Sequence, residues 1–218
     1  MFVNQSGRST PVKSRILVPQ RYQRQPVISR LVSRYRLTVN IKAASLVSGG
    51  ESDGWFDLEI FGNPQELTSS LSYLQGLGVN LLQIAIANQI QPSSNSQHFP
   101  NLDRKLSISK LPHQPQQSSQ QIQQWITGGQ TSRLRVQLCI LKTYHQKPII
   151  SQLVSRYGLT VNIFSASLPP DLQEDGWFDL DLWGRSEQIY SSLTYLEKMG
   201  LPLWIDWSSV YSNSLLIE

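Results

Sequence analysis

The chain is poor in the residues that build disulfides and metal centres. Its 218 residues include one cysteine, Cys139, which excludes an intramolecular disulfide framework and a cage of thiolate ligands. Its three histidines, His98, His113 and His145, are scattered, so the sequence offers no clustered histidine ligands for a metal. We therefore expect the protein to bind neither a metal nor a cofactor.

Long hydrophobic runs are also missing. No apolar run approaches the roughly 20 residues that a membrane-spanning helix needs. The chain does not open with a charged segment followed by a hydrophobic stretch, as a secretory signal would. These absences predict a soluble, cytoplasmic protein without membrane insertion.

Acidic residues are absent from the first 50 positions, which hold nine Lys and Arg in a chain of net charge +4. Such a bias is found in proteins that bind nucleic acids or membrane surfaces. The bias is equally explained if these basic residues are solvent-exposed positions of a domain whose acidic residues come later in the sequence. We rank nucleic-acid binding below the alternatives given below.

The chain contains an internal repeat. Q-P-V-I-S-R-L-V-S-R-Y-R-L-T-V-N-I ends at Ile41, and K-P-I-I-S-Q-L-V-S-R-Y-G-L-T-V-N-I ends at Ile163, an offset of 122 residues. The same offset aligns the chain without a gap from about residue 13 to 86. The repeat predicts two domains, at 13–86 and 132–207.

The segments outside the two copies differ in composition from them. Residues 87–131 are rich in Gln, Ser and Pro, which is typical of a disordered linker. Within it, Ile122, Trp125 and Ile126 are compatible with a short helix or a docking segment. Residues 1–12 and 208–218 are expected to be terminal tails.

Hydrophobic patterning predicts the element order βαββαβ in each copy. Segments 13–18 and 135–140 alternate as strands do, and Pro26 and Pro148 suit the first turn of a helix. An apolar stripe on this helix places Ser29 on the opposite, polar side. Gly158 suits the left-handed end of the helix, where the first copy has Arg36. The order is that of a ferredoxin-like fold, with the first and third strands central in the sheet.

Acidic and aromatic residues alternate along the third strand of each copy, S-D-G-W-F-D-L-E-I-F-G at 52–62 and E-D-G-W-F-D-L-D-L-W-G at 174–184. Carboxylates two apart on a strand are separated by roughly 6.6–7 Å, a spacing that does not exclude an acid–base pair. No His or Cys partner splits their pKa values, so we predict that the protein is not an enzyme. We expect ion pairs with the first strand instead. The acids are Asp57, Glu59, Asp179 and Asp181, and the bases Lys13, Arg15 and Arg135.

Three motifs shared by both copies carry a family resemblance. They are P-[VI]-I-S-x-L-V-S-R-Y-x-L-T-V-N-I, the D-G-W-F-D-L strand and the helix end L-x-Y-L-x-x-x-G. Together they resemble the NIL domain, which is similar to ACT-type regulatory modules. That domain is known from the regulatory end of methionine-importer ATPase subunits and from some ferredoxins. The resemblance implies an α+β protein of two ferredoxin-like βαββαβ (ACT-like) domains joined by a disordered linker.

The chain departs from the family pattern in several ways. The Asn-Ile-Leu that gives the family its name appears as Asn40-Ile41-Lys42 and Asn162-Ile163-Phe164. No G-x-x-x-x-G-K-[ST] is present, so the chain is no transporter ATPase, and one cysteine cannot hold an iron–sulfur cluster. A regulatory module without catalysis remains, and the resemblance implies methionine sensing at an interface between the domains.

Two groups of residues are candidates for binding. The aromatics of the open sheet face have several readings: cover by a loop or tail, or a docking surface for the other repeat, another subunit or a small ligand. An RNA-stacking platform is disfavoured by the neighbouring acids. The tentative ligand or interface residues are Asn40, Trp55, Phe61, Asn162, Trp177 and Trp183. The loops before the first helix of each copy are weaker candidates, for an anion, with Arg21, Arg24, His145 and Lys147.

The preferred function is a ligand-sensing regulatory module that binds a small amino acid, such as methionine, between its two domains. The alternative is a protein-interaction adaptor that uses the open sheet faces and binds a protein partner or a second copy of itself.

Overall fold

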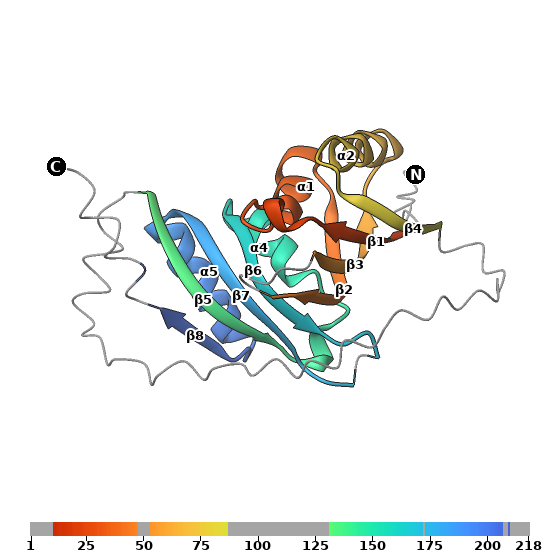
Figure 1. The fold of residues 1–218 in the computed structure, drawn as a ribbon. Coiled ribbons are helices and arrows are strands. Elements are labelled where there is room, and N and C mark those ends of the chain that lie inside the picture. The colour runs from red at the N-terminus through yellow and green to blue at the C-terminus, as the bar shows by residue number, and fades with distance from the viewer. Residues whose placement is uncertain (1–10, 48–52, 87–130, 172, 207–208, 210–218) are drawn as a thin grey trace, which may run out of the picture.

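Each repeat folds as βαββαβ, with a short 3₁₀ turn before its first helix (Figure 1). The computed structural model describes residues 11–47, 53–86, 131–171, 173–206 and 209. The predictions for 87–130 and for most of the two tails lie outside these residues. The first repeat comprises β1 (Val12–Val18), η1 (Gln20–Tyr22), α1 (Val27–Tyr35), β2 (Thr38–Leu46), β3 (Gly54–Phe61), α2 (Pro64–Gly76) and β4 (Asn80–Ile86). The second comprises β5 (Thr131–Ile140), η2 (Lys142–Tyr144), α4 (Ile149–Tyr157), β6 (Thr160–Leu168), β7 (Gly176–Arg185), α5 (Ser186–Lys198) and β8 (Leu203–Asp206).

The two repeats share one eight-stranded antiparallel sheet, in the order β4-β1-β3-β2-β6-β7-β5-β8. The first and third strands lie in the middle of each half, as the ferredoxin-like prediction requires. The halves meet at edge strands β2 and β6, which pair over Ala44↔Leu168, Ser45↔Ser167 and Leu46↔Ala166. The repeats therefore join edge to edge and not through their open sheet faces, so the aromatics of those faces are not a docking surface for the other repeat.

The helices form one layer on one side of the sheet. Helix α1 packs against α2 within its repeat and against α4 of the other repeat, and α4 packs against α5. Across the junction, α1 contacts β6 and α4 contacts β2. Phe56, Leu58 and Ile60 point to this layer and are buried, as their alternation predicts. One continuous core therefore extends through both repeats.

Local sequence signals account for several helix ends. Asn63 caps α2, because its side chain accepts a 2.8 Å hydrogen bond from the N–H of Glu66, and Pro64 takes the first helical position. Helices α1 and α4 both end in the left-handed conformation, at Arg36 with φ 53° and at Gly158 with φ 67°. The first repeat thus has an arginine where the second repeat has the glycine that suits this backbone conformation.

The polar position predicted for Ser29 is wrong. Ser29 and its counterpart Ser151 are both buried, because the neighbouring repeat covers the side of the helix that periodicity alone assigns to solvent. None of the helices that the structure describes is both long and apolar enough to cross a membrane.

Candidate functional site at the junction of the two repeats

Two pseudo-symmetric contacts hold the repeats together in addition to the three residue pairs between β2 and β6. At the β2 junction, the loop and helix start of the second repeat (141–151) lie against β2. At the β6 junction, the equivalent segment of the first repeat (19–29) lies against β6. The N–H of Val39 donates to Ser151 Oγ, and the N–H of Val161 donates to Ser29 Oγ, both over 3.1 Å. Each helix serine thus satisfies a backbone donor on the part of the strand edge that lies outside the β2–β6 pairing.

The two asparagines of the predicted site are buried at these junctions and differ in their contacts. Asn40 Nδ2 donates to the backbone carbonyl of His145 across the β2 junction, over 3.0 Å. Asn162 holds the same place at the β6 junction and is 7% exposed. Its Oδ1 is buried and has no hydrogen-bond partner within the described ranges. A buried acceptor without a donor is unusual in a folded protein, and a water molecule, an ion or a ligand can supply the missing donor or charge.

The structure does not bring the four predicted anion-binding residues together. Arg21 stacks on Tyr22, with 5.1 Å between its guanidinium carbon and the ring centroid, and Lys147 stacks on Tyr144 over 4.7 Å. His145 is 3% exposed, and neither of its ring nitrogens has a hydrogen-bond partner among the described residues. Arg24 alone of the four lines a large cavity, described below.

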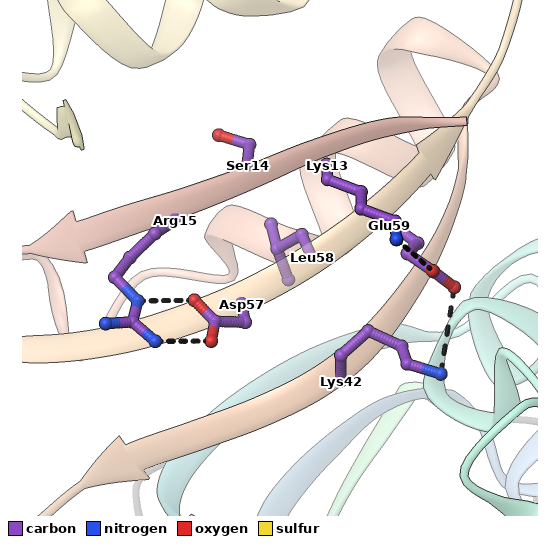
Figure 2. Close-up of a pocket in the computed structure, with 7 residues that line it drawn as sticks. All are labelled: Lys13, Ser14, Arg15, Lys42, Asp57, Leu58 and Glu59. Atoms are coloured by element: carbon purple, nitrogen blue, oxygen red, sulfur yellow. Dashed lines mark hydrogen bonds and ion pairs between the residues drawn. The ribbon is translucent and has the colours of Figure 1, made fainter. Parts of the chain in front are cut away.

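The acids on the open face of the first repeat are paired as predicted (Figure 2). Arg15 binds Asp57 through two parallel hydrogen bonds of 2.5 Å each. This contact raises the pKa of the Arg15 guanidinium, chiefly through the hydrogen bond to Asp57. Lys13 and Lys42 approach Glu59 from two sides, at 4.0 and 3.8 Å. The group surrounds a hollow of about 280 Å³.

The acids on the open face of the second repeat are paired differently. Asp181 is buried and accepts hydrogen bonds from Arg133 Nη2 at 2.6 Å and Arg135 Nε at 3.1 Å, so its predicted pairing with Arg135 is confirmed. The ion pair predicted for Asp179 is wrong. That carboxylate accepts hydrogen bonds from Gln137 and Ser165, because Gln137 stands where the first repeat has Arg15.

Most of the predicted aromatics lie under or beside another flat group. Trp55 lies under the guanidinium of Arg15 at 4.7 Å, and Trp183 under that of Arg133 at 5.0 Å. Trp177 packs on Trp204 with 5.4 Å between ring centroids. Phe61 is half-buried, whereas Trp183 remains 42% exposed. Trp183 is therefore the member of the group with the largest free surface.

A cavity of about 700 Å³ opens on the sheet face at the β6 junction. The first repeat contributes Arg24 and Pro26 from the loop before α1, and β5, β6 and β7 of the second repeat contribute the rest of the wall. The second repeat's lining residues are Arg133, Arg135, Thr160, Asn162, Phe164, Asp181 and Trp183. The cavity is the place where predicted residues from both groups, Asn162, Trp183 and Arg24, come together.

Phe164 and Arg133 are among the cavity residues that were not predicted as site residues. Phe164 lies under the guanidinium of Arg135 at 4.4 Å, and Arg133 has an Nε that is buried without a partner in the described part of the chain. Alternation along β6 places Phe164 on the same face as Asn162 and would have found it. Arg133 precedes the segment that the two copies share, so no repeat-based signal pointed to it.

The cavity wall combines charged groups with aromatic surface. Three guanidinium groups and one carboxylate give its wall an excess of positive charge, and Phe164 and Trp183 supply apolar surface. A nucleophile paired with a base is not found among its lining residues. In the described ranges, no group of three His, Cys, Asp or Glu residues is placed to hold a metal ion.

Comparison with known proteins gives one match in each repeat. A family model described as NIL domain matches residues 14–81 and 134–204. One relative is an uncharacterized protein from Synechococcus elongatus, 38% identical over 73 residues, which are 34% of this chain and 90% of the relative. Another, from Synechocystis sp., is 39% identical over 77 residues, 35% of this chain and 78% of the relative.

Similarity to solved structures is low. A crystal structure of an unknown protein from Galdieria sulphuraria gives a TM-score of 0.26 at 10% identity, covering 90% of this chain and 97% of that one. The small subunit of acetolactate synthase from Thermotoga maritima gives 0.22 at 12% identity, covering 90% and 97%. TM-scores this low support no conclusion about the fold or function of this chain.

Proposed function

The chain belongs to the NIL domain family, with one domain in each repeat, and on that premise we propose that it is a non-catalytic regulatory module that senses a small amino acid such as methionine. The observation that carries the proposal is the cavity at the β6 junction, whose wall comes from both repeats. A ligand there contacts the loop of one domain and the sheet of the other. Binding would therefore stabilise the arrangement of the two domains that forms the cavity, and a regulatory module needs such a shift between arrangements.

The chemistry of the cavity wall suits an α-amino acid. Arg24, together with Arg133 Nε, supplies donors for a carboxylate. Asn162 Oδ1 is an acceptor without a donor and suits the ammonium group. The rings of Phe164 and Trp183 offer the apolar contact that a thioether side chain favours.

Isothermal titration calorimetry of the full chain with methionine and then with the other amino acids tests the proposal. We expect heat of binding and a rise in melting temperature with methionine or a closely similar amino acid, because a ligand that binds only the folded state stabilises it. Norleucine, in which a methylene replaces the sulfur, is the matched control for the thioether. Absence of both heat and thermal stabilisation with every amino acid would refute the ligand part of the proposal.

A protein-interaction adaptor is the second candidate, and the exposed Trp183 favours it. Large aromatics with free surface are typical anchors of protein interfaces, and Trp183 is 42% exposed. A purified partner, or a second copy of this chain, would then bind the open sheet face, and Trp183→Ala would weaken that binding at least 10-fold. Unchanged affinity of the Trp183→Ala variant would exclude this face as the interface. A cytoplasmic location and a flexible linker remain parts of the proposal, but the predicted linker bounds of 87–131 are one residue too long, because Thr131 begins β5.

A further inference from the structure

We infer that the chain has one ligand site and not the two that its repeat would allow, because Lys42 closes the equivalent place at the β2 junction and Pro11 stands there in place of Arg133. At the open β6 junction, the ligand's anionic group would bridge Arg24 of the first repeat to the arginines of the second. The inference rests on the proposed function, since it concerns the same cavity. It assigns Arg24 and Phe164 as the residues that determine binding there.

The two junctions differ at the positions that face each other across the repeats. At the β2 junction, Lys42 Nζ donates to Gln146 Oε1 over 2.7 Å and lies 3.8 Å from Glu59 Oε2. Its ammonium group thus joins the loop of the second repeat to the sheet of the first (Figure 2 shows its contact with Glu59). The 122-residue offset places Phe164 at the position of Lys42 and Arg24 at that of Gln146.

This exchange accounts for a difference between the two places on the sheet face. The hollow of about 280 Å³ beside Lys42 is lined by first-repeat residues alone. The cavity of about 700 Å³ beside Phe164 is lined by both repeats. A phenylalanine cannot accept a hydrogen bond from Arg24 as Gln146 accepts one from Lys42, so the β6 junction lacks the corresponding bridge.

The unmatched groups at the β6 junction define what the ligand must carry. Arg133 Nε is a buried donor and Asn162 Oδ1 a buried acceptor, and both lack partners in the described part of the chain. With Arg24 at the rim of the same cavity, the donors favour an anionic group, either a carboxylate or a phosphate. The acceptor favours a ligand that also has a hydrogen-bond donor near that anion.

Calorimetry with three probes separates these requirements in the full chain. L-Methionine carries both groups, L-methioninamide lacks the carboxylate, and inorganic phosphate is an anion without the amino group. We expect a stoichiometry of one for methionine, and binding of methioninamide that is about 10- to 100-fold weaker, since it loses a charge-assisted hydrogen bond. Equal affinity for methionine and its amide would overturn the anion bridge.

Two pairs of substitutions exchange residues between the junctions. Arg24→Gln with Phe164→Lys copies the closed arrangement to the β6 junction and is expected to abolish binding. Lys42→Phe with Gln146→Arg removes the Lys42 bridge at the β2 junction, where Pro11 stands in place of Arg133, and is expected to leave the stoichiometry at one. Circular dichroism and the melting temperature show that each variant is folded, and Arg24→Lys should retain part of the affinity.

The outcomes distinguish this inference from the proposed function. A stoichiometry of two in the natural sequence, or unchanged binding in the Arg24→Gln/Phe164→Lys variant, would overturn the single site while amino-acid sensing stands. Phosphate binding with a stoichiometry of one, lost in that variant, with no response to any amino acid, would support the site and refute the amino acid. No heat with any of the three probes or with any other amino acid would overturn both.

Discussion

Removal of the two buried serine hydroxyls at the junctions tests the edge-to-edge arrangement directly. Ser29→Ala removes the acceptor of the Val161 N–H, and Ser151→Ala removes the acceptor of the Val39 N–H. Each of these two hydrogen bonds is 3.1 Å long. A buried donor left without an acceptor costs about 1–3 kcal/mol. Alanine recovers up to ~0.7 kcal/mol through its higher helix propensity. We therefore expect each variant to lose about 1–2 kcal/mol of unfolding free energy.

The double variant and two control variants sharpen the test. Because the two contacts share no residue, their effects should add to about 2–4 kcal/mol, a large part of the 5–15 kcal/mol typical of a domain. Ser33 and Ser155 are exposed serines in the same helices. Their replacement by alanine removes no buried contact, so it should leave stability unchanged or slightly raised.

Urea unfolding followed by far-ultraviolet circular dichroism and by tryptophan fluorescence provides the measurement. In the natural sequence we expect the two signals to change together, because one core passes through both repeats. In the double variant the transitions should separate as the repeats unfold independently. If Ser29→Ala were as stable as Ser33→Ala, the described junction would be wrong.

Three further changes have expected outcomes. Arg36→Gly should raise the free energy of unfolding by about 1 kcal/mol, because Arg36 has the left-handed φ of 53°. Gly158→Arg should lower the free energy of unfolding for the same reason. Melting temperatures of both variants equal to that of the natural sequence would contradict this. Ser14 has a buried hydroxyl without a partner among the described residues, and the second repeat has Val136 at this position. Ser14→Val should therefore stabilise the fold by about 1–3 kcal/mol, as measured by urea unfolding. A loss of stability would show that the hydroxyl is needed. Burial, with a smaller contribution from the charge of Asp175, raises the pKa of Cys139 to about 11, so its thiol should react with Ellman's reagent at pH 8 only when urea unfolds the chain; rapid labelling in the native state would refute its burial.

The same Cys139 shift sets the sign of one pH effect. Between about pH 9 and 11 the unfolded chain has lost the thiol proton that the folded chain keeps, so the free energy of unfolding falls as the pH rises. A Cys139→Ala variant should lack this component of the fall.

Much of each domain could be predicted from the sequence because the repeat supplies two independent copies of each signal. The element order, the central first and third strands and the inward Phe56 and Leu58 follow from periodicity, which depends only on local backbone geometry. The pairings of Arg15 with Asp57 and of Arg135 with Asp181 follow from the same alternation. These features are set within one repeat.

The features that failed, or were never predicted, depend on how the repeats meet. Periodicity placed Ser29 opposite the apolar stripe, and nothing in one helix shows that a second domain covers that side. The junction of β2 with β6 involves strand edges, whereas alternation reports only strand faces. The cavity at the β6 junction is lined by both Arg24 and Phe164, which lie in different repeats, so no local pattern joins them.

Joining two domains in one chain permits an asymmetry that a symmetric dimer cannot have. In a two-fold dimer every contact occurs twice, so a closed site on one side requires a closed site on the other. Here Ser29 and Ser151 make the same contact at both junctions. Lys42 and Phe164, by contrast, occupy equivalent places with different chemistry. The contacts that join the domains are therefore duplicated, while the residues that face the proposed ligand differ. One junction can then respond to a ligand while the other keeps the domains together in its absence.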